Sequence, residues 1–268
     1  DICGVTFSRN SAGVKAFGGA IFRTCDTTPL AKKTAPVTID RSTFDANESG
    51  SAGALYMHQV DLTVTSSTFS NNVSRAGAGG AIWAEGSDEG PADVTLKLTN
   101  VTVAKNTARE ALGGGFFIGA HVTGGEFLHV TVASNEVTTA SGNQYLVFGA
   151  GIVGDVTKLK LTNSIFANNK KPAPVAGESA NCQPGGFIDG GGNVEFISKD
   201  HPDPKRCVSG STVEDPLLAA LALTEGPTQT MSLGTDSPAI GKGTANCTAT
   251  DQRGHTRKTP CAAGAFEP

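Results

Sequence analysis

Residues 69–82 contain two short blocks, Phe69-Ser70-Asn71-Asn72 and Gly79-Gly80-Ala81-Ile82, and both blocks recur along the chain. The first block is a Phe or Val followed three residues later by Asn, and it starts at Phe7, Phe44, Phe69, Val103, Val132 and Phe166. The second block is three small residues and then an apolar one, which is Ile21, Leu55, Ile82, Phe116 or Ile152. Successive first blocks start 25 to 37 residues apart. A fixed unit with loops of different length between its copies is typical of a solenoid.

Columns of similar residues appear when the units are aligned on the Phe or Val of the first block, which we call the anchor. Five residues before the anchor, each complete unit has an apolar residue: Ile39, Val64, Leu98, Phe127 and Leu161. Two residues before it, the column is Ser42, Ser67, Val101, Val130 and Ser164. Successive side chains of a strand point to opposite faces, so the inward-facing positions shift by one residue between these columns. We therefore expect two strands with a corner between them.

Two further columns predict how the coils are joined. One residue before the anchor, a column of β-branched residues should face outward: Thr6, Thr43, Thr68, Thr102, Thr131 and Ile165. Three residues after the anchor, each Asn is expected to adopt a left-handed turn conformation and to bond its amide to the Asn of the next coil. This predicted ladder contains Asn10, Asn47, Asn72, Asn106, Asn135 and Asn169. The Gly/Ala block is expected to form another tight corner.

These patterns predict an all-β fold, a right-handed parallel β-helix of about six to seven coils. A β-sandwich would also give regular turn signals, but it would not place identical residues in vertical register. The composition fits a narrow core, because 34 Gly accompany only 13 Phe, 2 Tyr, 1 Trp and 2 Met. We divide the chain into coils over residues 1–214 and a C-terminal capping segment over 215–268 that folds over the last coil, since an uncovered final rung would expose unpaired backbone groups.

Charge and hydropathy exclude several partners. The formal net charge is −4, and no run of Lys and Arg is longer than a pair, so a nucleic acid is not an expected partner. The longest apolar run, from Leu217 to Leu223, has seven residues, whereas a membrane-spanning helix needs about 20. We expect no membrane-spanning segment, no cofactor and no metal.

Six cysteines without a C-x-x-C pair favour disulfides in an oxidising compartment, while six buried free thiols in a cytosolic protein are the alternative. They are Cys3, Cys25, Cys182, Cys207, Cys247 and Cys261. Pairing of nearest neighbours predicts the bonds Cys3–Cys25, Cys182–Cys207 and Cys247–Cys261, although six cysteines allow many other connectivities.

The two repeated blocks resemble the repeats of chlamydial-type polymorphic outer-membrane proteins. The C-terminal part is similar to the signature of bacterial "choice-of-anchor Q" β-helix proteins, through segments that include Asp215-Pro216-Leu217, Ser237-Pro238-Ala239-Ile240, Asp251-Gln252-Arg253-Gly254 and Gly264-Ala265-Phe266-Glu267. It departs from that signature at Thr224-Glu225-Gly226 and at Ala262-Ala263. The resemblance implies a right-handed β-helix and an exported location, and it implies little chemistry.

An enzyme is the alternative to a structural role, because many β-helices cleave polysaccharides. Such reactions need paired carboxylates, or an acidic calcium site with a basic residue. The outward positions before the anchor form a candidate ligand-facing ribbon of mixed charge: Asp61, Lys97, Glu126, Lys158 and Lys160, with His58 and His129 nearby. We interpret it as a solvated strand face and assign no catalytic residue.

Other polar residues are interpreted as structural. His121, His201 and His255 are single turn or surface residues, Asp251 and Arg253 form an ion pair in a turn, and Gly190-Gly191-Gly192 form a corner. An ice-binding function would need paired Thr columns, and only one column is regular.

The sequence therefore predicts an exported bacterial protein that is not an enzyme and has a structural or adhesive role at the cell surface or outside the cell. Its expected partners are other copies of itself or components of cell surfaces, glycans among them. The chain enters its first unit in mid-strand. An uncovered first rung would favour head-to-tail stacking of copies.

Overall fold

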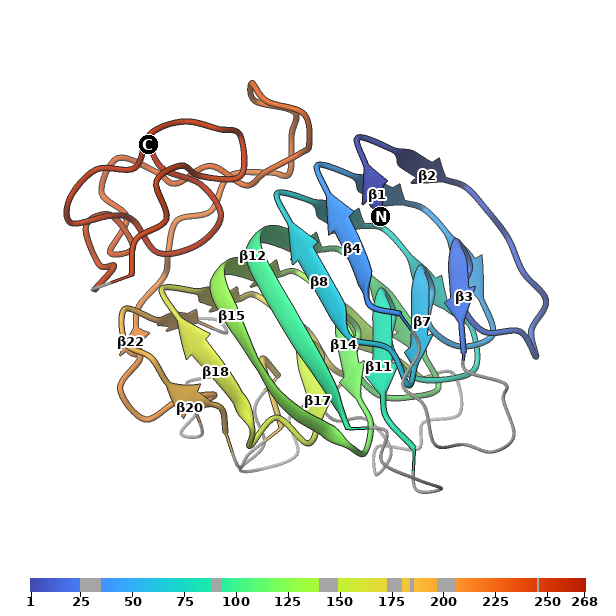
Figure 1. Ribbon diagram of the computed structural model, residues 1–268. Helices are drawn as coiled ribbons and strands as arrows, with labels where there is room; N and C mark the ends of the chain where they lie inside the picture. The colour runs from blue at the N-terminus through green and yellow to red at the C-terminus, as the bar shows by residue number, and fades with distance from the viewer. Residues whose placement is uncertain are drawn as a thin grey trace.

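The computed structural model describes residues 1–24, 35–87, 93–139, 149–172, 180–183, 186–196, 206–244 and 246–268. Every regular element within these ranges is a β-strand. The strands form three sheets, and all pairs of neighbouring strands in them are parallel (Figure 1). A β-sandwich of antiparallel strands is thereby excluded.

The largest sheet has 13 strands in two halves that meet at a bend. The first half contains β1 (Ile2–Cys3), β4 (Val37–Asp40), β8 (Leu62–Thr65), β18 (Leu159–Thr162) and β20 (Ile188–Asp189). The second half contains β2 (Thr6–Ser8), β5 (Thr43–Asp45), β9 (Thr68–Ser70), β19 (Ile165–Ala167), β21 (Val194–Phe196) and β22 (Thr212–Val213). Two long strands run through both halves, β12 (Val94–Ala104) and β15 (Val122–Ala133).

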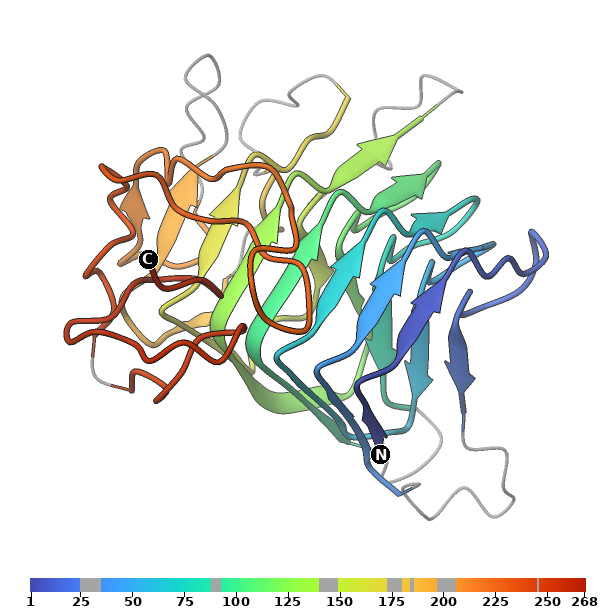
Figure 2. The same cartoon turned by 90° about the horizontal axis from the view of Figure 1, so that it is seen from above.

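Two smaller sheets complete the cross-section. The four-stranded sheet contains β6 (Glu48–Ser49), β10 (Val73–Ser74), β13 (Thr107–Arg109) and β16 (Glu136–Thr138). The five-stranded sheet contains β3 (Ile21–Arg23), β7 (Leu55–His58), β11 (Ile82–Glu85), β14 (Phe116–Ile118) and β17 (Ile152–Gly154). The chain visits the first half, the second half, the four-stranded and the five-stranded sheet in this order, and then repeats it. This path is consistent with a parallel β-helix, and successive rungs lie side by side in Figure 2.

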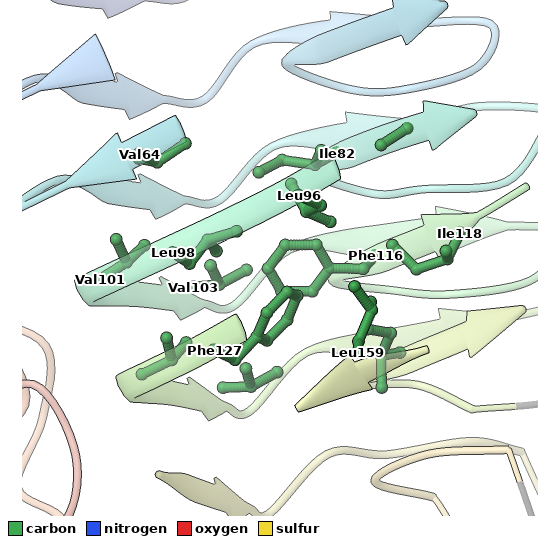
Figure 3. Packing of buried hydrophobic residues seen from close by; sticks show 14 of the residues in the cluster. Val64, Ile82, Leu96, Leu98, Val101, Val103, Phe116, Ile118, Phe127 and Leu159 are labelled. Carbon is green, nitrogen blue, oxygen red and sulfur yellow. The ribbon is translucent and has the colours of Figure 1, made fainter. Parts of the chain in front are cut away.

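The anchor column lies in register inside the coil. Phe7 pairs with Phe44, Phe44 with Phe69, and Phe69 with Val103. The rings of Phe44 and Phe69 are stacked with centroids 4.6 Å apart, and both side chains are fully buried. The inward columns before the corner are buried with them; Figure 3 shows Leu96 and Leu98 of β12 beside Phe116 and Phe127. The core is thus a stack of like residues, as the alignment of the units predicts.

The predicted corner between the two halves is present. It falls three residues before the anchor, where the backbone is left-handed with φ between 44° and 55°, at Arg41, Ser66, Asn100, His129 and Asn163. Because one residue turns the chain there, the inward-facing positions shift by one. The shift leaves both Leu98 and Val101 of β12 completely buried.

The Asn side chains form a continuous ladder of hydrogen bonds through the coil. Each Nδ2 donates to the Oδ1 of the next Asn, over distances of 2.7 to 3.0 Å from Asn10 to Asn169. Asn181 adds a seventh member, because it accepts from Asn169 at 2.8 Å. One detail of the prediction was wrong: the left-handed residue is the one before each Asn, such as Ala46 or Lys105. That turn lets the Asn amide reach back to the neighbouring anchor carbonyl, as Asn72 does to Phe44.

The Gly/Ala block forms the corner before the five-stranded sheet. Its first residue has a positive φ, for example 71° at Gly79, where glycine avoids the strain that a side chain would add. Its second residue faces a neighbouring coil at very short range: a Cβ on Gly80 would lie 2.0 Å from the carbonyl oxygen of Gly114. Glycine at this position therefore permits the close approach of successive coils.

The C-terminal segment lies along the flank of the coil, over the second half of the large sheet, where it packs on Ala104 and Ala133 and also on Val194 of the late strand β21 (Figure 2). Its role as a cap of the last coil stays a prediction. Gln252 is buried there: its Oε1 accepts from the Thr102 hydroxyl at 2.7 Å, and its Nε2 donates to the Thr68 hydroxyl at 2.9 Å. The Thr131 hydroxyl accepts from the backbone N–H of Ala265 at 3.0 Å. The Thr column thus faces away from the core, but the segment covers Thr68, Thr102 and Thr131, whereas Thr6 is exposed.

A different part of the chain closes the C-terminal end of the core. Cys207 and Val208 belong to the main hydrophobic cluster, and both are buried. At the anchor position of the last complete rung stands Glu195, whose carboxylate accepts from the N–H groups of both residues at 2.9 and 3.2 Å. Burial raises the pKa of Glu195. Residues before 215, including Cys207 and Val208, therefore cover the C-terminal end of the core. Residues after 215 pack on the outer face of the large sheet.

Two of the three expected disulfides are present. Cys182–Cys207 joins the segment that covers the end of the core to the last coils. Cys247–Cys261 closes a loop within the C-terminal segment. Cys3 is a free, exposed cysteine, so the expected bond to Cys25 is not formed at Cys3; Cys25 itself lies outside the described residues. The Sγ of Cys3 instead accepts from the Arg41 guanidinium at 3.2 Å. In the described part of the chain, no helix has the length and apolar character needed to cross a membrane.

Candidate functional site

The outer face of the five-stranded sheet carries a line of aromatic side chains. Phe22 of β3, Tyr56 of β7, Trp83 of β11 and Phe117 of β14 stand in register on successive rungs. Each follows a residue that faces inward: Ile21, Leu55, Ile82 and Phe116. Phe17 packs beside Tyr56, with ring centroids 4.8 Å apart. We call these five residues, Phe17, Phe22, Tyr56, Trp83 and Phe117, the aromatic ridge.

The rings of the ridge touch one another from coil to coil. Phe22 and Tyr56 are stacked, with centroids 5.3 Å apart and planes 7° apart. Tyr56 and Trp83 meet edge to face at 5.5 Å, and Trp83 lies 4.6 Å from Phe117. Aromatic pairs prefer these stacked and edge-to-face arrangements. The ridge is therefore one continuous surface of packed rings and not a set of separate side chains.

Glu85, two residues after Trp83 on β11, orients the polar atoms of the ridge. Its carboxylate accepts from the Tyr56 hydroxyl at 2.5 Å and from the Trp83 indole N–H at 2.9 Å. Burial, and then the hydrogen bond and charge of Glu85, raise the pKa of Tyr56. Tyr56 consequently stays a neutral hydrogen-bond donor, and both rings are held in fixed orientations. His58, next to Tyr56 on the same face, lies 3.0 Å from the Thr24 hydroxyl.

The ridge is partly open to solvent. Phe22 is 53% exposed and Phe17 is 40% exposed, while Tyr56, Trp83 and Phe117 are half-buried. The only Trp of the chain and one of its two Tyr lie here. Contiguous exposed apolar surface on a soluble protein usually marks an interaction site, and aromatic residues are enriched at such sites. The geometry therefore favours binding at this face.

The sequence already carried the signal for this ridge. In each unit the residue directly after the Gly/Ala block and its apolar residue is Phe22, Tyr56, Trp83, Phe117 or Val153. Period-two alternation after the inward apolar residue would have placed this column on the outside. The predicted ligand face lies instead on the strand before the anchor, so the sequence-based prediction missed this column.

The candidate ribbon is brought together only in part. Lys97, Glu126 and Lys160 are in register on β12, β15 and β18, and the Lys160 ammonium lies 3.5 Å from the Glu126 carboxylate. Asp61 accepts from the backbone N–H and the hydroxyl of Thr95, and Lys158 is an exposed turn residue. The ribbon is thus a short row of alternating charge in which Glu126 is paired. Its role as a ligand face stays a prediction.

The three other histidines that the structure describes lie apart from one another, two at the surface and one buried. His121 lies 3.4 Å from Asp93, and His255 lies 3.0 Å from Glu225, both at the surface; His201 is outside the described residues. His129 is completely buried under the C-terminal segment, and this burial, together with the charge of Arg257, lowers its pKa to about 3. His129 is therefore a neutral imidazole.

The acidic turn of the C-terminal segment is a buried ion-pair network. Arg253 binds Asp251 at 2.8 Å, and its guanidinium lies over the Phe266 ring at 3.7 Å. Arg257 binds Glu267 at 3.2 Å, with both side chains buried. The Asp-Gln-Arg-Gly and Gly-Ala-Phe-Glu segments thus hold the C-terminal segment together.

A comparison with known families identifies one repeat. The Chlamydia polymorphic membrane protein (Chlamydia_PMP) repeat matches residues 66–85. This range covers β9, β10 and β11, and it contains Asn72, the Gly/Ala block and Trp83. No curated protein matches the chain. The chain thus combines parallel β structure with a repeat of surface or outer-membrane proteins. The likeness of the C-terminal part to the choice-of-anchor Q signature stays a prediction.

Proposed function

We propose that this protein is an exported, non-catalytic β-helix of the cell surface or the extracellular space that adheres to glycans through the aromatic ridge. We infer a right-handed coil of about six to seven turns, because parallel strand connections are right-handed in nearly all proteins. The surface-protein repeat at residues 66–85 supports the location, and the two disulfides fit an oxidising compartment.

The aromatic ridge is the observation that carries the adhesive role. A sugar ring has an apolar face of C–H groups, which packs on an aromatic ring, and a rim of hydroxyls, which needs hydrogen-bond partners. The ridge provides packed rings, and beside them Glu85 and His58 provide a carboxylate and an imidazole. Polar groups at the edge of an apolar surface are what orient a bound ligand. A glycan chain lying along the coil axis would meet one ring on each rung.

The single Trp of the chain makes the test specific to this site, because a ligand that packs on the ridge changes the fluorescence of Trp83. We expect immobilised or soluble polysaccharides to bind the full chain, and Trp83→Ala with Tyr56→Ala to weaken binding by about 10-fold or more, since such aromatic residues often dominate binding energy. Circular dichroism of the variant checks that the coil is intact.

Lys97→Ala with Glu126→Ala is the matched control, because it alters the charged ribbon on another face. Binding that is lost in this control but kept in the ridge variant would move the site to the ribbon. Shortened saccharides in the reaction mixture would favour the alternative, a polysaccharide-active enzyme. Failure of all tested acidic and neutral polysaccharides to bind would contradict the proposal.

Head-to-tail association of copies is a second part of the proposal. Large exposed apolar side chains stand on the first and the last of the described coils: Val5 and Val14 on the first, and Val213, 46% exposed, on strand β22. Strands at the edge of a sheet offer unpaired backbone groups to another chain. We expect sedimentation of the full chain to show species that grow with concentration, and Val213→Glu to disperse them. Leu223→Glu, at a more exposed position (63%) in the C-terminal segment, should have no effect; an equal effect, or monomers throughout, would contradict stacking.

A further inference from the structure

The buried imidazole of His129 lies against a disulfide. His129 occupies the bend of β15, where its left-handed backbone (φ 54°) directs the side chain under the C-terminal segment. Its Nε2 lies 3.8 Å from the Sγ of Cys261 and 3.4 Å from the Nδ2 of Asn163. His129 belongs neither to the aromatic ridge nor to the hydrophobic core of the coil.

The disulfide partner completes a set of three potential metal ligands. One ligand atom each from His129, Cys247 and Cys261 lies within 4.8 Å of the other two. Two cysteine sulfurs and one imidazole are the donor set that zinc and other borderline or soft cations prefer. In the oxidised protein the sulfurs are bonded to each other and cannot serve as thiolates. The set therefore becomes a ligand set only when the bond is reduced.

Cys247–Cys261 is a better candidate for a metal site than Cys182–Cys207, because a reductant can reach it and its imidazole neighbour is held in place. Cys247 is partly exposed, so a reductant can reach it. The second set, Cys182, Cys207 and Glu195, is completely buried, and the Glu195 carboxylate already accepts two backbone hydrogen bonds. His129, by contrast, is held by the coil and faces the sulfur from a fixed strand.

We propose that reduction of Cys247–Cys261 opens a binding site for Zn²⁺ or a similar divalent cation, with His129, Cys247 and Cys261 as its ligands. A dithiol reductant supplies two electrons and two protons to the disulfide and is itself oxidised to a disulfide. The cation then replaces the two thiol protons, which leave to solvent. The bound metal would keep the C-terminal segment docked on the coil under reducing conditions, in place of the lost covalent bond.

The test is a titration of the full chain with Co²⁺, whose complexes with thiolates absorb light. We expect the reduced protein to bind one Co²⁺ with a thiolate-to-metal charge-transfer band that Zn²⁺ abolishes, and the oxidised protein to show no band. We also expect Zn²⁺ to slow hydrogen exchange over residues 246–268 in the reduced protein. Absence of the band after reduction, whether or not the segment stays docked, overturns the proposal.

Two variants distinguish the imidazole from the thiols alone. His129→Gln should weaken Co²⁺ binding by about 10-fold or more, because even partners outside the ligand shell change metal affinity by such factors. His255→Gln, an exposed imidazole of the same segment, should bind as the unchanged protein does. Equal affinities of the His129→Gln and unchanged proteins, or loss of the band in Glu195→Gln alone, would overturn the assignment.

Discussion

Replacement of Phe69 by alanine is expected to lower the free energy of unfolding by about 3–5 kcal/mol. The Phe69 ring is completely buried, stacks on Phe44 at 4.6 Å and lies in register with Val103 on the next coil. Its removal leaves a cavity between two rigid neighbours. The backbone cannot close that cavity, because every rung is fixed by hydrogen bonds to the rungs on both sides. Denaturant unfolding followed by circular dichroism measures the loss.

Phe22→Ala is the matched control for this prediction, since it removes the same group from a side chain that is 53% exposed. We expect a loss below about 1 kcal/mol there, because less apolar surface is removed from water on folding. A coil unfolds with nearest-neighbour coupling, so Phe69→Ala should also separate the melting of the first coils from that of the later ones. Equal losses in the two variants would mean that the anchor stack does not hold the coils together.

The repeated part of the fold could be predicted because each rung repeats the same physical requirements. An inward anchor, a corner, an Asn and a small-residue block leave their marks in the sequence every time, and five or six copies make the columns visible. The anchors Phe44 and Phe69 and the corner at Ser66 lie where those columns place them. The left-handed residue beside each Asn was misplaced by one position, because Asn itself favours that conformation and its neighbours vary.

The C-terminal segment could not be predicted in the same way, because it occurs once and has no columns. Its contacts are between single residues distant in sequence, such as Gln252 with Thr102 or Arg257 with Asn100. The Thr column looked like a solvent-facing surface, since nothing local distinguishes an exposed outer face from a covered one. Likewise the sequence placed His129 near the charged ribbon, although it stands at the bend and is buried against Cys261 of the C-terminal segment.

Of the candidate site, too, the repeated part could be predicted from the sequence and the part that depends on single contacts could not. The ridge column could have been found from the sequence, because Tyr56 and Trp83 repeat in register after the Gly/Ala block. Its fixed geometry could not, because Glu85 binds Tyr56 of the neighbouring coil as well as Trp83 of its own strand. Such bonds depend on the register between coils, which only the folded structure supplies.

Asn106 lies at the centre of the Asn ladder. The Oδ1 of Asn106 accepts from both the backbone N–H and the Nδ2 of Asn72, at 2.9 and 2.8 Å. Its Nδ2 donates to the carbonyl of Phe69 at 3.0 Å and to the Oδ1 of Asn135 at 2.9 Å. All of these groups are buried, and water cannot replace a missing partner inside the coil.

Asn106→Ala should therefore lower the free energy of unfolding by about 3 kcal/mol or more, because each buried group left without a partner costs about 1–3 kcal/mol. Asn106→Asp should be no better, since a carboxylate keeps the acceptor, loses both donors and adds a buried charge. Asn10→Ala removes the exposed end of the same ladder, whose amide has one ladder bond, to Asn47, and should cost less than about 1 kcal/mol. Denaturant unfolding of the three variants decides the matter: if Asn106→Ala and Asn10→Ala are equally stable, the ladder follows from the stacking of coils and does not stabilise it.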